Sequence, residues 1–86
     1  MSHNYNIGVD GAKAIADALK VNPVLTKLDL SNNYSIGPEG AKAIAEALKV
    51  NAVLTKLNLE FNNLGNAGGK AVRKAVKNRS GFVLEL

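Results

Sequence analysis

The chain has 86 residues and a formal net charge of +4; 47% of its residues are hydrophobic and none is cysteine. This length predicts one small domain, residues 1–86, and the lack of cysteine excludes disulfide bonds and thiolate metal sites. No apolar run reaches the roughly 18 residues that span a bilayer, and residues 1–10 lack the regions of a signal peptide, which predicts a cytoplasmic protein.

One unit is repeated along the chain. Residues 11–30 and 40–59 are identical at 17 of 20 positions with an offset of 29 residues, and residues 64–86 form a third, more divergent copy. Such a repeat is typical of solenoids, in which a unit that cannot bury its apolar face alone stacks on its neighbours. We therefore expect three units, at approximately residues 1–30, 31–59 and 60–86.

Each unit combines two periodicities. In the second unit, Ile44 and Leu48 lie four residues apart within residues 39–50 and polar residues occupy the opposite stripe, which predicts a helix. Pro38 suits the first position of that helix, and Glu39 suits the positive end of its dipole. The period then changes to two in the pattern L-x-x-L-x-L, which predicts a short strand with one apolar face.

Stacking of these units fixes the expected architecture. Because a helix separates each strand from the next, the strands must be parallel. Strands lie about 4.8 Å apart and helices about 8–10 Å apart, so the sheet should be concave and the helices convex. Two columns of apolar side chains should form, with these members: Leu28, Leu57 and Leu84 in the sheet, and Ile15, Ile44 and Val72 in the helices.

The repeat resembles that of the leucine-rich repeat family, L-x-x-L-x-L-x-x-N followed by Ile/Leu-Gly and a helix. The residues that carry the resemblance are Leu25, Leu28, Leu30, Asn33, Ile36 and Gly37, and then Leu54, Leu57, Leu59, Asn62, Leu64 and Gly65. A unit of 28–29 residues with a full helix is similar to the ribonuclease-inhibitor-like subclass. The resemblance implies an α/β right-handed solenoid, a horseshoe segment with a short parallel sheet on its concave face. It also implies a structural role for Asn4, Asn33 and Asn62, whose side chains would satisfy backbone groups in the turn after each strand.

The resemblance further implies a protein-interaction or scaffolding module that binds its partner through the concave face. The outward strand positions predicted to contact a protein partner are Lys27, Asp29, Ser31, Lys56, Asn58, Glu60, Val83 and Glu85. The alternative is that these side chains only keep the sheet soluble.

The excess positive charge lies in the last third of the chain. Residues 1–60 hold six lysines and six acidic residues, whereas residues 61–86 hold five cations and one acid. Lys70, Arg73, Lys74 and Lys77 form a basic stripe on the predicted third helix, which could bind an anionic partner or be a solvated helix face. The stripe has no interleaved aromatic residues, so nucleic-acid binding is not expected.

No residue pattern predicts catalysis. The segment from Gly65 to Lys70 superficially resembles a phosphate-binding loop, but its glycine spacing is wrong and Ala71 occupies the Ser/Thr position. His3 is the only histidine and lies beside the first residue, and no Ser–His–acid set or spaced Cys/His cluster exists. We expect no enzymatic activity, no cofactor and no metal.

Three functional hypotheses remain from the sequence. The first is the interaction module, which would be part of a longer array because both predicted sheet edges lack a polar capping repeat. The second, implied by the family resemblance alone, is a regulatory repeat domain that acts on a GTPase or belongs to an innate-immune type of receptor. The third is a natural or engineered unit that assembles with itself through its exposed repeat edges.

Overall fold

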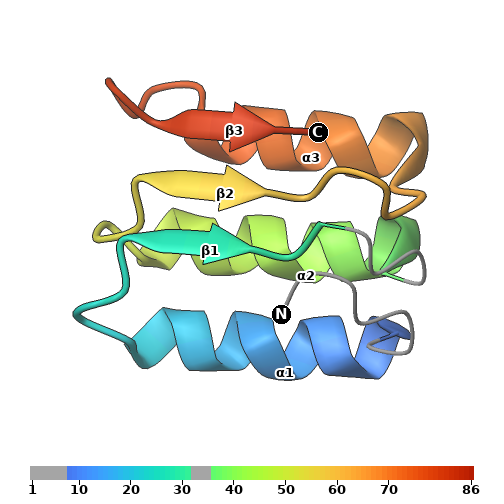
Figure 1. Ribbon diagram of the computed structural model, residues 1–86, viewed down its shortest axis with the longest axis horizontal. Coiled ribbons are helices and arrows are strands. Elements are labelled where there is room, and N and C mark those ends of the chain that lie inside the picture. Colours follow the sequence, from blue (N-terminus) through green and yellow to red (C-terminus); the bar gives the residue numbers. More distant parts are fainter. Residues whose placement is uncertain (1–7, 32–35) are drawn as a thin grey trace.

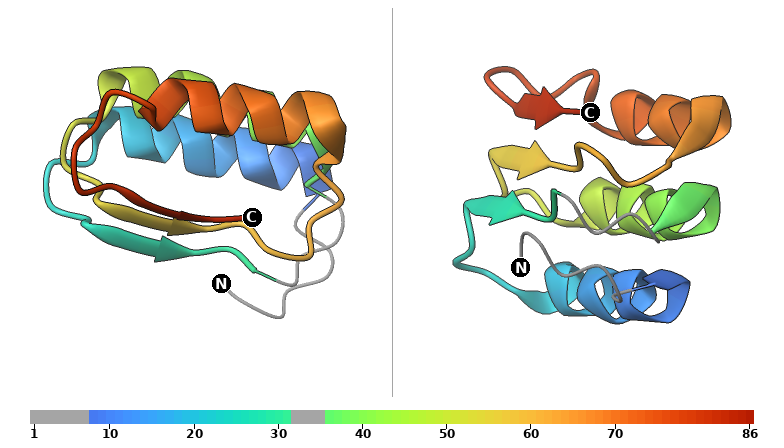
Figure 2. Two further views of the ribbon diagram at one scale, coloured as in Figure 1. Left: turned by 90° about the horizontal axis from the view of Figure 1, so that it is seen from above. Right: turned by 45° about the vertical axis from the view of Figure 1, so that its right-hand side comes forward.

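The computed structural model describes residues 8–31 and 36–86. The helices are α1 (Gly8–Val21), α2 (Gly37–Val50) and α3 (Gly65–Val76), and each is followed by a three-residue strand: β1 (Lys27–Asp29), β2 (Lys56–Asn58) and β3 (Val83–Glu85). The helices lie side by side in one layer and the strands form a second layer against them (Figures 1 and 2). This is the helix–strand order that the repeats predict.

The sheet is parallel throughout, with strand order β1-β2-β3. Its register places Leu28 opposite Leu57 and Leu57 opposite Leu84, which confirms the predicted column of leucines. Leu57 is fully buried, because it has a strand on either side, whereas Leu28 and Leu84 on the outer strands are half-buried.

Close helix packing depends on small residues. A Cβ atom placed on Gly40 of α2 would lie 3.0 Å from the Cβ atom of Ala12 in α1, and one placed on Gly68 of α3 would lie 3.0 Å from that of Ala41. There is therefore no room for a larger side chain at either contact. In the predicted helical column, Ile44 and Val72 are fully buried and Ile15 is half-buried.

The glycine that recurs at the start of each helix has a backbone cause. Gly37 and Gly65 have φ angles of +66° and +69°, a region that favours glycine. Each is the first residue of its helix, so the chain turns sharply between strand and helix at these positions.

Asn62, in the turn after β2, links that turn to the first repeat. Its side chain is buried, and its Nδ2 donates hydrogen bonds to the backbone oxygens of Leu30 at 2.8 Å, Leu59 at 2.9 Å and Glu60 at 3.1 Å. The structural role predicted for Asn62 is thereby confirmed. Its predicted counterparts, Asn4 and Asn33, lie outside the described residues.

Candidate functional site

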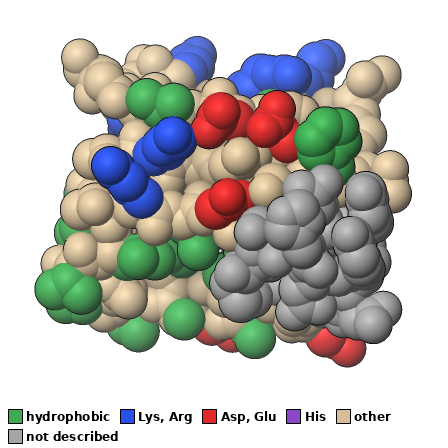
Figure 3. Space-filling model, in the orientation of Figure 1, with side chains coloured by type: hydrophobic (Ala, Val, Ile, Leu, Met, Phe, Trp, Pro, Cys, Tyr) green, Lys and Arg blue, Asp and Glu red, His purple; other side chains and the backbone are tan. Residues whose placement is uncertain are grey.

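The concave face, defined here as the solvent-facing surface of the three strands, carries two columns of side chains. In register across the sheet, Lys27 lies opposite Lys56, and Lys56 lies opposite Val83; the other column is Asp29, Asn58 and Glu85. The basic and the acidic side chains gather in separate parts of this face (Figure 3). A charge gradient therefore runs along the strands, from the lysine column to the acidic one.

An open hollow of about 270 Å³ lies on this face. Five of the eight residues predicted to contact a partner line it, together with Leu28: Lys27, Asp29, Lys56, Asn58 and Glu85. Across it, Lys56 Nζ lies 3.7 Å from Glu85 Oε1, and both side chains are partly exposed. This ion pair is worth at most about 1 kcal/mol because water screens it, so a partner could displace either member at low cost.

Asp29 and Asn58 also terminate their strands. Asp29 Oδ1 accepts a hydrogen bond from the backbone N–H of Ser31, and Asn58 Oδ1 accepts one from that of Glu60, both at 2.9 Å. Such bonds form turns in which the side chain holds the backbone two residues on. The two side chains are therefore fixed in position before any partner binds.

The prediction that Ser31 faces outward is wrong. The period-two pattern would continue outward from Lys27 and Asp29 to Ser31, but strand β1 ends at Asp29. The turn that Asp29 stabilises rotates the chain, and Ser31 is only 7% exposed. Glu60 follows the equivalent turn and is half-buried, whereas Val83 is well exposed beside Lys56.

The basic stripe is present as a solvent-exposed face of α3. In α1 and α2, lysines pair with acids three residues earlier, as in Lys42–Glu39 at 3.7 Å and Lys49–Glu46 at 3.0 Å. Helix α3 contains no acidic residue. Three cations of α3 and the residue that follows the helix therefore form a concentrated positive surface, with these members: Lys70, Arg73, Lys74 and Lys77.

The glycine-rich segment that superficially resembles a phosphate loop lies within α3 itself. Gly68 faces Ala41 and the backbone of Pro38, so it serves helix packing. In residues 8–31 and 36–86, no group of three His, Cys, Asp or Glu side chains could hold a metal ion. No helix in the described part of the chain is long and apolar enough to cross a membrane.

Sequence reasoning missed a second set of bonds between repeats, at the other end of the strands. Asn51 Nδ2 donates to the backbone oxygen of Leu19 at 2.7 Å. At the matching place in the third repeat, Arg79 Nη1 donates to the oxygen of Leu48 at 3.2 Å, and its Nη2 donates to that of Leu54. The sequence does repeat an asparagine at this position, because Asn22 lies 29 residues before Asn51. The repeat pattern does not predict an arginine at position 79.

Comparisons with known proteins agree with this geometry. A family model described as a leucine-rich repeat matches residues 21–45 and 50–72, which is more than half of the chain. The chain belongs to the leucine-rich repeat family, and its fold is an α/β solenoid segment of that family.

The chain is similar to a solved structure of leiomodin-1 actin-binding site 2. The TM-score is 0.85, the sequence identity is 26%, and the match covers 98% of this chain and 48% of that one. The chain therefore spans about half the length of that structure. No curated protein matches the sequence.

Proposed function

We propose that this chain is a non-enzymatic protein-interaction module that binds its partner through the concave face. One observation carries the proposal: the strand register aligns Lys27 with Lys56, and Asp29 with Asn58 and Glu85, in two columns on one small sheet. Membership of a repeat family and similarity to the leiomodin-1 actin-binding site support it.

The columns suggest how a partner is recognised. Neighbouring strands lie about 4.8 Å apart, so charged groups recur across the sheet at close to the rise of about 4.5 Å between helix residues three apart. A segment that crosses the strands would place acidic groups beside the lysine column and donors beside Asp29 and Glu85. Because Asp29 and Asn58 are held by backbone hydrogen bonds, they lose little conformational entropy on binding.

Actin is the first partner to test, because the similar leiomodin-1 structure is named as an actin-binding site. Labelled chain is titrated with monomeric actin and sedimented with filaments. The Lys27→Glu/Lys56→Glu variant should lose binding, and a matched variant, Lys13→Glu/Lys42→Glu, changes the charge equally on exposed positions of the helices and should keep it.

The outcomes separate the concave face from general charge effects. Binding that survives the change at Lys27 and Lys56 contradicts the concave-face assignment, and equal loss in both variants indicates nonspecific electrostatics. If the wild-type chain does not bind actin, the proteins that it captures are identified by mass spectrometry. Their binding to the two variants is then compared with their binding to the wild-type chain. Failure to capture any protein in a manner sensitive to Lys27 and Lys56 refutes the proposal.

A second candidate surface is the basic stripe on α3, favoured by the absence of the acidic partners that lysines have in α1 and α2. Its partner would be an acidic protein surface, and binding would weaken as salt increases. The variant Lys74→Glu restores the residue type of Glu46 at this position and should abolish such binding, while Lys49→Glu serves as its control on α2. Binding that does not change with salt or with Lys74→Glu contradicts this role.

The finer assignments rest on the same comparisons and stay proposals. A helix of 12 to 14 residues in every unit supports the ribonuclease-inhibitor-like subclass. We also propose that residues 1–86 act as one domain in a cytoplasmic setting, within a longer array or beside a partner. A role toward a GTPase or in an innate-immune receptor stays a prediction.

A further inference from the structure

Positive charge gathers at one edge of the molecule. The three connections from a helix to the next strand lie at this edge, on the left in Figure 1. We call this surface the turn edge and define it as residues 20–28, 49–57 and 77–84. It holds six cations and no acidic residue. One of the six, Arg79, donates to backbone oxygens of the second repeat, and the other five are lysines.

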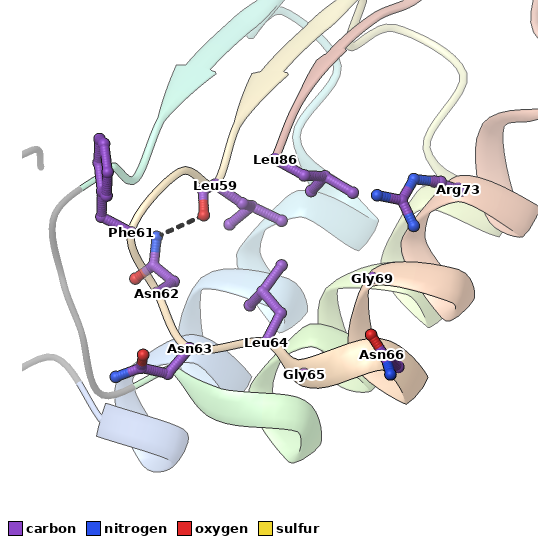
Figure 4. Close-up of a pocket in the computed structure, with 10 residues that line it drawn as sticks. All are labelled: Leu59, Phe61, Asn62, Asn63, Leu64, Gly65, Asn66, Gly69, Arg73 and Leu86. Atoms are coloured by element: carbon purple, nitrogen blue, oxygen red, sulfur yellow. Dashed lines mark hydrogen bonds between the residues drawn. The ribbon is translucent and has the colours of Figure 1, made fainter.

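The opposite edge, where the strands end and the helices begin, has the reverse composition. Its described residues are 8–12, 29–31, 36–41, 58–66 and 85–86. They hold five acids and no cation. Figure 4 shows the part of this edge beside α3, where Asn63 and Asn66 are uncharged and the nearby cation, Arg73, comes from the last turn of the helix. The two edges therefore carry opposite charge along the direction of the strands.

Helix dipoles explain only part of this division. Acids stabilise the start of a helix and cations stabilise its end, as Asp10 and Lys20 do in α1. The dipoles do not explain Lys27 and Lys56, which begin β1 and β2 at the same edge. The positive charge of the turn edge therefore exceeds what the helices need.

Exposed valines lie among these cations. Val21, Val24 and Val50 are 80%, 77% and 63% exposed, and none of them belongs to the core. Hydrophobic side chains gather along the same side of the molecule in Figure 3, at the left. Valine is a weak helix former, so helix propensity does not explain Val21 and Val50 at the ends of α1 and α2.

The exposure of this edge does not depend on where the sequence begins or ends. Helix α2 has a helix packed on either side, yet Val50 remains well exposed. Val21 occupies the same position one unit earlier. Further units stacked on either end would therefore lengthen the turn edge without covering it.

The form of the turn edge indicates the kind of partner that fits it. Its valines protrude from turns, and a protein partner would have to supply a matching pocket for each of them. A lipid bilayer accepts protruding apolar side chains in its headgroup region, and flanking lysines reach the charges of anionic lipids. The absence of acidic residues from the turn edge suits such a negative surface.

We propose that the turn edge binds the surface of an anionic lipid bilayer. The three valines enter the headgroup region, and Lys20 and Lys49 contact the lipid charges. These lysines pair with Asp17 and Glu46, at 3.7 and 3.0 Å, but both pairs are exposed and lipid headgroups can replace the carboxylates at little cost. The proposal is independent of the concave face, because its test leaves Lys27 and Lys56 unchanged.

Cosedimentation of labelled chain with lipid vesicles tests the proposal. One set of vesicles contains phosphatidylcholine and phosphatidylserine in equal amounts, and the other contains phosphatidylcholine alone. The chain should bind the first set and not the second, and binding should weaken as salt increases.

Two variants of the turn edge are compared with a matched control. Lys20→Gln/Lys49→Gln should weaken binding about 10- to 30-fold, because each cation near an anionic surface contributes to it. Its control, Lys13→Gln/Lys42→Gln, removes two exposed lysines from the same helices but off the turn edge and should weaken binding much less. The variant Val21→Ser/Val24→Ser/Val50→Ser keeps the net charge and should also bind more weakly. All the substituted side chains are exposed, so circular dichroism should show the wild-type fold.

Four results would overturn the proposal. Failure to bind either set of vesicles, or equal binding to both, excludes an anionic bilayer and leaves an acidic protein as the partner of this edge. Equal losses in the two lysine variants indicate general attraction by a basic chain. Unchanged binding of the serine variant shows that the valines do not enter the bilayer. Binding lost in Lys70→Gln/Lys74→Gln but kept in Lys20→Gln/Lys49→Gln places the contact on the basic stripe.

Discussion

Replacing Leu57 with alanine tests the stacking of the repeats at the centre of the core. Leu57 is 0% exposed and lies in register between Leu28 and Leu84. The substitution removes three carbons, which corresponds to about 2.4 kcal/mol at roughly 0.8 kcal/mol per buried methylene. The cavity that remains raises the loss to about 3–4 kcal/mol, because the strands on both sides restrict collapse. Since a chain of this size has an unfolding free energy of about 4–13 kcal/mol, the variant should lose much of its stability.

Urea unfolding followed by far-UV circular dichroism measures this loss. Leu28→Ala is the matched control, because Leu28 is half-buried and, within residues 8–31 and 36–86, has a neighbouring strand on one side only. Its loss should be clearly smaller than that of Leu57→Ala. An unchanged unfolding midpoint for Leu57→Ala, or a larger loss for Leu28→Ala, refutes the assignment of Leu57 to the centre of the core.

Three further substitutions test the joints between repeats. Asn62→Ala removes the donor to three backbone oxygens and should cost about 2–3 kcal/mol in urea unfolding; a value within error of wild type contradicts this role. Gly68→Ala places a Cβ atom 3.0 Å from Ala41 and should lower the thermal midpoint. Gly69→Ala meets no contact closer than 3.4 Å and should leave the midpoint unchanged or raise it. Equal shifts for the two variants would count against the packing argument. Arg79→Lys keeps the charge but loses the planar guanidinium that donates both bonds, so the free energy of unfolding should fall by about 1–2 kcal/mol. An unchanged value would mean that the two bonds do not stabilise the fold.

Much of the fold could be predicted because the sequence contains the same unit more than once, so that a pattern in one unit can be checked in the next. Two nearly identical units place equivalent residues at equivalent positions of a helix or strand, so the column through Leu57 and the parallel strand order follow from sequence alone. The structural role of Asn62 was predictable from the family resemblance. The concave position of Lys27, Lys56 and Glu85 followed from the period-two pattern, and these residues do line one hollow.

The errors arise where a side chain overrides the pattern. Ser31 continues the alternation of β1, but the hydrogen bond from its N–H to Asp29 ends the strand first and leaves Ser31 buried. Arg79 occupies the position of Asn51 in the third repeat, but it can replace Asn51 only because its long side chain reaches the backbone oxygen of Leu48. That reach depends on three-dimensional distances, which the sequence does not give. The partner-binding role of the concave residues is not encoded in such local rules and stays a prediction.

The hydrogen bonds from side chains to backbone oxygens described above run in the same direction between units. Three side chains donate to a backbone oxygen of an earlier unit: Asn51 to Leu19, Asn62 to Leu30 and Arg79 to Leu48. In these bonds the later unit supplies the side-chain donor and the earlier unit supplies the backbone acceptor. Tandem duplication of one unit in a gene would add both sets together, so an array of this kind can lengthen without creating an unsatisfied joint.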